Sequence, residues 1–157
     1  MAKAREIPGL DADLRFRDAA VLTVRVRAEE LWERSVDVLD VSDIERVHDM
    51  RVATRRLRAV LEIYAPCFPK AEHKAVLKDV KALADALGAR RDPDVQLEDL
   101  EGLAGALSGA DAPGIELLRT SLRAEQQHGN EVLAAALAAA EQHDLRGRLQ
   151  RLAAMAP

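Results

Sequence analysis

The spacing of apolar residues narrows the fold of this chain more than any other feature of its sequence. Apolar positions recur at intervals of three, four and seven, as they do at Leu14, Val21, Val24, Ala28, Leu31 and Val38. This rhythm places them on one face of a helix. Aromatic residues make up only 3% of the chain, and the dominance of Ala and Leu favours helices over strands. We therefore predict an all-α fold, an antiparallel bundle of about five to six helices in a single domain over 1–157.

Proline, glycine and capping residues divide this helical pattern into segments. The run 42-SDIE-45 has the spacing of a capping box at the start of the second helix. Gly88 is expected to end the third helix, and Asp92 followed by Pro93 is expected to start a fourth. A loop is predicted over 108–114. The predicted helices span 11–39, 43–64, 71–87, 92–107, 115–141 and 145–154.

Charge and targeting signals exclude several classes of protein. The net charge of −4 provides no global attraction to nucleic acid or to a membrane, so any anion binding must come from local clusters. Cys67 is the only cysteine and cannot form an internal disulfide, which fits a reducing compartment. The first residues lack the apolar segment of a signal peptide, and the apolar run 132–140 is too short to span a bilayer. We expect a soluble, cytoplasmic protein with no membrane partner.

The predicted helix over 43–64 carries the most unusual pattern of charge. On a wheel of about 100° per residue, its cations fall on one stripe: His48, Arg51, Arg55 and Arg58. An apolar stripe lies roughly opposite, as expected for a face packed on a core. Apolar or small side chains also flank the cationic stripe on both sides: Val47, Thr54 and Leu61 on one, and Val52, Ala59 and Ile63 on the other. Such flanks indicate the lining of a partly enclosed channel, in which we predict a bound anion.

A solvated or internally salt-bridged face is the alternative interpretation. Acids are scarce near the stripe, although Glu62 can pair with Arg58. Arg51 and Arg55 lie four residues apart, and like charges at this spacing destabilise an isolated helix by a few tenths of a kcal/mol. The pattern alone leaves both interpretations open.

The next predicted helix carries a second cationic stripe, formed by Lys74, Lys78 and Lys81, with Asp85 next along it. The short connector 66-PCFP-69 makes the two helices antiparallel neighbours. Their cations can therefore face a common groove. Phosphate suits this chemistry, because arginine engages phosphate oxygens through a planar fork and lysine supplies a mobile point charge.

These residues resemble those of the CHAD family, the conserved histidine α-helical domain. The family motif H-x-x-R-x-x-x-R-R-x-R is matched within 47-VHDMRVATRRLRAVLEIY-64, and an LG pair followed by 91-RDPDV-95 matches a second signature. The resemblance covers about 11–107. It implies two related four-helix halves around a basic channel that binds inorganic polyphosphate. Arg56 ranks lower than the others, because it points about 100° away from the stripe. The predicted polyphosphate-binding residues are His48, Arg51, Arg55, Arg56, Arg58, Lys74, Lys78, Lys81 and Arg91.

Only one half of that architecture is recognisable. Nothing after Leu107 repeats the basic motif, and we assign no function to the arginines in that part of the sequence. We therefore predict a homodimer in which two copies share one basic channel. A fragment of a longer protein is the alternative explanation.

No catalytic residue, metal site or cofactor is predicted. His73, His128 and His143 are scattered, and helix capping explains Asp92 and Asp94 more simply than a catalytic pair of carboxylates. We predict a non-catalytic module that binds or targets polyphosphate in the cytoplasm, with polyphosphate granules as one expected place. The alternatives are a subunit of a phosphoanhydride-processing enzyme and a nucleic-acid or protein adaptor. Nucleic acid is disfavoured, because the basic stripe carries no aromatic side chain on which bases could stack.

Overall fold

Helices account for nearly all of the ordered secondary structure. A computed structural model describes residues 3–155, and this part of the chain contains no strand. The all-α prediction is therefore confirmed; the outermost residues of the predicted domain, 1–2 and 156–157, lie outside the described part. Two short 3₁₀ turns cover Ala65–Cys67 and Gly109–Asp111. The five α-helices are α1 (Phe16–Glu33), α2 (Ile44–Ile63), α3 (Lys70–Ala104), α4 (Ala112–Gln142) and α5 (Leu145–Ala154).

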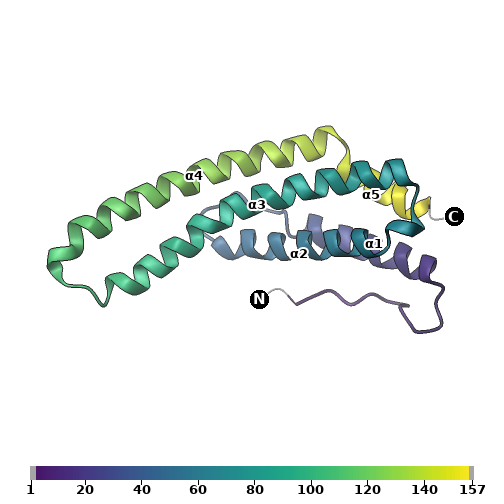
Figure 1. Cartoon of the computed structure of the whole chain (residues 1–157), viewed down its shortest axis with the longest axis horizontal. Coiled ribbons are helices and arrows are strands. Elements are labelled where there is room, and N and C mark those ends of the chain that lie inside the picture. The colour runs from purple at the N-terminus through teal and green to yellow at the C-terminus, as the bar shows by residue number, and fades with distance from the viewer. Residues whose placement is uncertain (1–2, 156–157) are drawn as a thin grey trace.

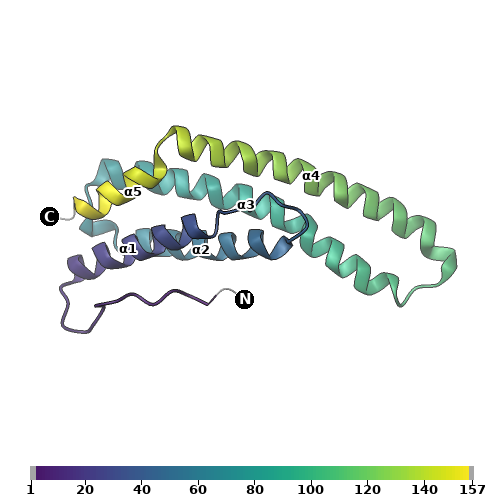
Figure 2. The same cartoon turned by 180° about the vertical axis from the view of Figure 1, so that it is seen from behind.

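The helices pack around α3, which lies between α2 and α4 and is antiparallel to both (Figure 1). The helix α1 contacts both α2 and α5. On α2, the apolar stripe faces this core, and Met50, Ala53 and Leu57 are at most 1% exposed. Burial of one such leucine stabilises the fold by roughly 1.5–3 kcal/mol relative to its exposure. Beyond the start of α2, α3 and α4 continue together as a two-helix projection, which is also seen from behind in Figure 2.

Local hydrogen bonds make α1 shorter than the predicted helix over 11–39. Before it, the Asp11 carboxylate accepts hydrogen bonds from the backbone N–H groups of Asp13 (2.9 Å) and Leu14 (3.0 Å), which form a turn. After it, Asp37 adopts a left-handed conformation with φ of 53°, which a helix cannot accommodate. The segments 11–15 and 34–39 therefore fold mostly as turns, although their apolar residues have helical spacing.

The predicted capping box of α2 is wrong in its details. Asp43 caps the helix by accepting a hydrogen bond from the backbone N–H of Glu45 at 3.2 Å. The Ser42 hydroxyl instead donates to Asp40 at 2.7 Å. The end of α2 at Ile63 and the connector that follows agree with the prediction.

The predicted break between 87 and 92 is also wrong, because α3 continues through Gly88 and Pro93 for 35 residues. Proline within a helix costs about 3 kcal/mol, since the carbonyl of Ala89 loses its usual N–H partner. Packing against α4 compensates at this point. Gly129 of α4 comes so close that an added Cβ would lie 2.9 Å from the Ala89 oxygen and 3.0 Å from the Cα of Arg90.

A buried polar network strengthens the same contact between α3 and α4. Arg90 is 0% exposed and Asp94 is 1% exposed, and they form an ion pair one turn apart on α3. Gln126 donates to Asp94 at 2.6 Å, and Arg90 donates to Asn130 at 3.2 Å. Asp94 is therefore a structural residue inside a helix and not a helix cap.

The C-terminal helices follow the prediction closely. The helix α4 begins three residues before the predicted position, because Ser108 and Asp111 form a capping box around the preceding 3₁₀ turn. The helix α5 has the predicted bounds. Among residues 3–155, no helix combines the length and apolar character needed to cross a bilayer.

Candidate functional site

Three of the predicted cations, Arg51, Arg55 and Arg58, line one groove between α2 and α3. Its volume is about 430 Å³. Short side chains on α3 leave this space open, because the facing turns carry alanine and glycine instead of large residues. The residues that α3 contributes are Ala84, Asp85, Gly88, Ala89 and Asp92.

The arginines of the groove differ in their partners. Arg51 is half-buried and Arg55 is exposed, and neither side chain makes a hydrogen bond or ion pair with any residue in 3–155. Arg58 donates to Glu62 at 3.1 Å, and Lys81 of α3 lies 3.2 Å from the same carboxylate. The hydrogen bond from Arg58, followed by that from Lys81, holds the pKa of Glu62 below its ordinary value. Glu62 therefore links the two cationic stripes.

Two carboxylates share the groove with the arginines. They are Asp85 and Asp92. The sequence places Asp85 at the end of the lysine stripe, whereas it predicts that Asp92 caps a helix. Because α3 is continuous, Asp92 lies two turns beyond Asp85 on the same face. The groove thus combines three arginines with two aspartates. Its net positive charge is therefore smaller than the one expected from the cationic stripe of α2 alone.

The lysine stripe lies in a wide, open depression beside the groove. Lys74, Lys78 and Lys81 line this depression, which has a volume of about 840 Å³. All of its lining residues belong to α3. Asp85 borders both the depression and the groove. The two predicted stripes therefore border each other at Asp85, but they do not line the common groove that the sequence led us to expect, because no lysine is among the groove-lining residues.

His48 is not among the groove-lining residues. It is half-buried, and its ring lies near Glu45 and Asp49, so that one ligand atom from each of the three residues falls within 4.8 Å of the others. Both carboxylates already face cations, since Arg34 lies 3.4 Å from Asp49 and Arg91 lies 3.9 Å from Glu45. Nothing else in the surroundings points to an ion, and the expectation of no metal site stays a prediction.

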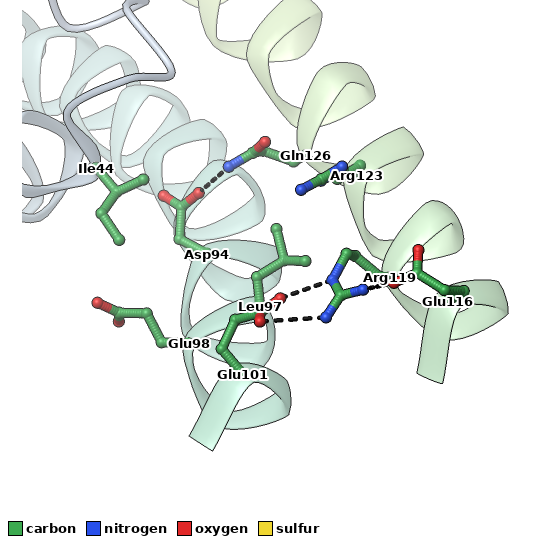
Figure 3. A pocket seen from close by; sticks show the side chains of 9 residues that line it. All are labelled: Ile44, Asp94, Leu97, Glu98, Glu101, Glu116, Arg119, Arg123 and Gln126. Carbon is green, nitrogen blue, oxygen red and sulfur yellow. Dashed lines mark hydrogen bonds and ion pairs between the residues drawn. The ribbon is translucent and has the colours of Figure 1, made fainter. Parts of the chain in front are cut away.

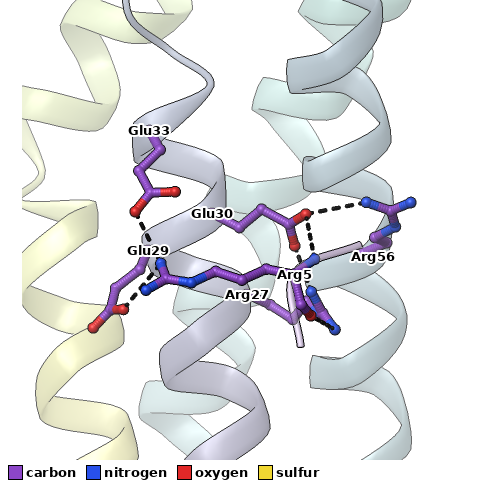
Figure 4. Close-up of polar contacts among 6 residues, drawn as sticks. All are labelled: Arg5, Arg27, Glu29, Glu30, Glu33 and Arg56. Atoms are coloured by element: carbon purple, nitrogen blue, oxygen red, sulfur yellow. Dashed lines mark hydrogen bonds and ion pairs between the residues drawn. The ribbon is translucent and has the colours of Figure 1, made fainter. Parts of the chain in front are cut away.

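Arg56 faces α1, on the side away from the groove. Its guanidinium donates to Glu30 at 3.1 Å, as Figure 4 shows. Glu30 is 2% exposed and also accepts a hydrogen bond from Arg27 at 2.5 Å. The N-terminal segment joins this cluster through Arg5, whose side chain lies 2.8 Å from Glu33. Arg56 thus satisfies a buried carboxylate, which gives this motif residue a structural role.

Figure 3 shows a separate cavity of about 620 Å³ between α3 and α4. Arg91 lies 3.9 Å from Glu45 near the start of α2, and it lines neither this cavity nor the groove. Its guanidinium is 3.6 Å from Glu98 and its side chain is 13% exposed. Figure 3 also shows Arg119 held by Glu101 at 2.7 Å and by Glu116. This cavity could not be predicted from the sequence, because it exists only where α3 continues past residue 92 beside α4. Its lining residues are Ile44, Asp94, Leu97, Glu98, Glu101, Glu116, Arg119, Arg123 and Gln126.

The flanks of the cationic stripe are only partly as expected. Val47, Thr54 and Leu61 are each 0% exposed, so this flank belongs to the core and is not left uncovered. On the other flank, Ala59 is exposed and Ile63 is 63% exposed. Apolar surface therefore remains on one side of the stripe.

Comparison with known proteins identifies the family. The CHAD domain profile matches residues 15–157. A segment of 65 residues is 40% identical to "Uncharacterized protein Rv2226" of Mycobacterium tuberculosis (strain ATCC 25618 / H37Rv). That segment is 41% of this chain but only 12% of the relative's length. No solved structure gives a significant match. The resemblance found in the sequence motifs is confirmed, and the chain belongs to the CHAD domain family.

Proposed function

We propose that the groove between α2 and α3 binds inorganic polyphosphate and that the chain acts as a non-catalytic binding or targeting module. The observation that carries this proposal is the pair Arg51 and Arg55, which line one groove without an ion-pair partner in residues 3–155. Their mutual repulsion destabilises the helix, and a bound polyanion would relieve it. Bidentate contacts from guanidinium groups suit phosphate oxygens.

The order of the cations supports a linear ligand. Because α2 and α3 are antiparallel, the sequence from Arg51 to Arg58 runs in the same direction as the sequence from Lys81 to Lys74. The two rows join where Arg58 and Lys81 contact Glu62. Each row covers seven residues of helix, so together they extend over roughly 20 Å at 1.5 Å per residue. An extended chain of phosphates can contact the whole row, whereas a single nucleotide reaches only part of it.

The two carboxylates in the groove do not favour the enzymatic alternative. A phosphoanhydride-processing site would need carboxylates close enough to share a metal ion. Asp85 and Asp92 are seven residues apart on one helix, a separation of about 10 Å along its axis. We assign them to limiting the strength of anion binding and propose no catalytic role.

The proposal is tested by titrating the protein with long-chain polyphosphate, tripolyphosphate, ATP and duplex DNA at two salt concentrations. We expect affinity to rise with phosphate chain length and to fall steeply with salt, because bound counterions are released. Equal affinities for long polyphosphate and duplex DNA would contradict the proposal and favour the nucleic-acid alternative.

A second copy of the chain is the protein partner that we propose for this surface. The exposed Ile63 and Ala59 beside the groove provide apolar area for such a contact, and the polar rim of cations provides charge. A homodimer therefore remains part of the proposal, whereas the shared basic channel predicted from the sequence does not.

A further inference from the structure

The projection formed by α3 and α4 bears on how the second copy binds. The inference drawn from it rests on the proposed function of the groove. We call residues 94–126 the arm. Figures 1 and 2 both show the arm extending past the start of α2, away from the rest of the bundle. Because α3 is one continuous helix through the base of the arm, the arm cannot fold back onto the groove of its own chain. Any contact between arm and groove must be made between two copies.

The arm is strongly acidic. It contains seven aspartate and glutamate residues against Arg119 and Arg123, a net charge of −5. Arg119 is enclosed by Glu101 and Glu116, so its charge is neutralised within the arm. Asp99 and Glu125 are exposed and form no ion pair within residues 3–155.

The groove region has the complementary charge. Residues 44–91, which comprise α2 and the first part of α3, contain eleven lysines and arginines against six aspartates and glutamates, a net charge of +5. Arg51 and Arg55 within it lack acidic partners in the described part of the chain. Arg90 pairs with Asp94 and Arg91 with Glu98 across the boundary between the two regions, so these charges cancel. The remaining cations and anions still form a surplus at separate places on the same molecule.

Apolar surface accompanies the charge on both sides. Near the tip of the arm, Leu103 is 54% exposed, Leu117 is 75% exposed and Leu118 is 48% exposed. Two packed helices can bury only their mutual faces, so burial of these leucines would require a third element. Ile63, at 63% exposure beside the groove, provides apolar area of the matching kind.

We propose that the acidic arm of a second copy lies along the basic groove of the first and that the reciprocal contact closes a two-fold dimer. In this dimer, carboxylates of the arm occupy the positions that phosphates would take. Polyphosphate then competes with the arm for Arg51 and Arg55 and separates the two copies.

This dimer differs from one in which two copies share a basic channel, and the two arrangements respond oppositely to conditions. Two basic faces repel each other, so a shared channel would be strengthened by salt and by bridging polyphosphate. Contact between an acidic arm and a basic groove is weakened by salt, because screening reduces attraction between opposite charges. It is also weakened by polyphosphate, which takes the place of the arm.

The decisive experiment measures molecular mass in solution by light scattering at low salt, without polyphosphate, for three charge variants. The arm variant is Asp99→Lys/Glu125→Lys, and the groove variant is Arg51→Glu/Arg55→Glu. The control, Asp13→Lys/Glu141→Lys, makes the same charge change as the arm variant at exposed positions outside the arm. Circular dichroism verifies that each variant is folded.

We expect the wild type and the control to be dimers and the arm and groove variants each to be monomers. A mixture of the two monomeric variants should form a heterodimer, since the lysine-bearing arm then meets the glutamate-bearing groove while the other pair of surfaces is native. Addition of long-chain polyphosphate, or of salt, should convert the wild-type dimer into monomers. The arm variant should bind polyphosphate several-fold more tightly than the control, because it lacks the competing arm.

A wild-type monomer at micromolar concentration, an arm variant that remains dimeric, or a dimer strengthened by polyphosphate would each overturn this inference. The first and second readouts need no polyphosphate, so they separate this inference from the proposed function. If the charge-reversal mixture dimerises as expected but polyphosphate does not bind, the contact of arm and groove stands and the proposed function fails.

Discussion

Single residues of the family motif divide into two roles. Arg51, Arg55 and Arg58 line the groove, while Arg56, inside the same motif, satisfies the buried Glu30. The helical wheel correctly predicts that Arg56 points away from the side of the helix that carries Arg55, because adjacent residues on a helix point about 100° apart. It could not identify Glu30 as the partner, since α1 and α2 meet only in the folded bundle. We expect Glu62, which contacts Arg58 beside the groove, and Gly88, which lines the groove, each to affect polyphosphate binding.

Glu62 contacts Arg58 and Lys81, and we expect it to compete with a bound anion for these two cations. We expect Glu62→Gln to increase affinity for polyphosphate by a few-fold, because both cations become available to the ligand. In the free protein, the pKa of Glu62 lies below its ordinary value owing to Arg58 first and Lys81 second, so the carboxylate stays charged to a lower pH than an isolated glutamate. Titration followed by NMR should show that Arg58→Gln raises this pKa. An unchanged pKa in that variant would contradict the contact.

Gly88 keeps the groove open. A Cβ added there meets no atom within 4 Å, so Gly88→Leu can be accommodated by the backbone while its side chain fills the groove. We expect polyphosphate affinity to fall about tenfold. The free energy of unfolding should stay equal or rise by up to about 1 kcal/mol, since glycine is a poor helix former.

Gly102→Leu on the same helix is the matched control, because its Cβ also meets nothing within 4 Å and it lies outside the groove. Equal binding by the two variants would show that the groove does not hold the ligand.

The long helix α3 shows where prediction from sequence reaches its limit. Gly88 and Pro93 have strong local preferences for ending helices, and the break predicted from them is wrong because α3 continues through both. What keeps the helix continuous is contact with Gly129 and Gln126 of α4, which lie more than 30 residues away in the sequence. Apolar spacing identified the helices and the cationic stripes, because these depend on neighbours in the sequence. The arm and the place of Asp92 in the groove depend on α3 being continuous and could not be predicted.

Gly129 allows the close approach of α4 to α3. We expect Gly129→Ala to destabilise the protein by about 1–3 kcal/mol, the range for forcing an extra methyl group into a packed contact, because its Cβ would meet backbone atoms at 2.9 Å and 3.0 Å. In contrast, Gly102→Ala should stabilise α3 by up to about 1 kcal/mol. Urea unfolding of both variants measures the difference, and a stabilising Gly129→Ala would contradict the described packing.

The buried ion pair of Arg90 and Asp94 is expected to be essential for α3 to pass through Pro93. Asp94→Ala leaves the guanidinium of Arg90 buried without a charge partner, which typically costs about 3–5 kcal/mol. The control Asp99→Ala, at an exposed position on the same helix, should change stability by less than about 0.5 kcal/mol. Thermal unfolding followed by circular dichroism distinguishes the two, and similar melting temperatures would show that the pair is dispensable.

The molecule as a whole separates its charges between a basic groove region and an acidic arm. Its net charge of −4 conceals this arrangement, and only the path of α3 and α4 shows that the two regions lie apart. Family membership and helical class were accessible from the sequence, because the basic motif and the apolar spacing are local. The relation between groove and arm required the tertiary structure. We expect the cations of the groove, and not cations in general, to bind polyphosphate.

The most direct test of that claim measures the dissociation constant of long-chain polyphosphate at low salt for three proteins. These are the wild type, Arg51→Glu/Arg55→Glu, and the control Arg17→Glu/Arg25→Glu, which makes the same charge change at two exposed arginines on α1. We expect the groove variant to lose at least about tenfold in affinity, or about 1.4 kcal/mol, with a shallower dependence on salt, while the control loses much less. Equal losses in both variants, or no loss in the groove variant, would show that Arg51 and Arg55 do not form the binding site.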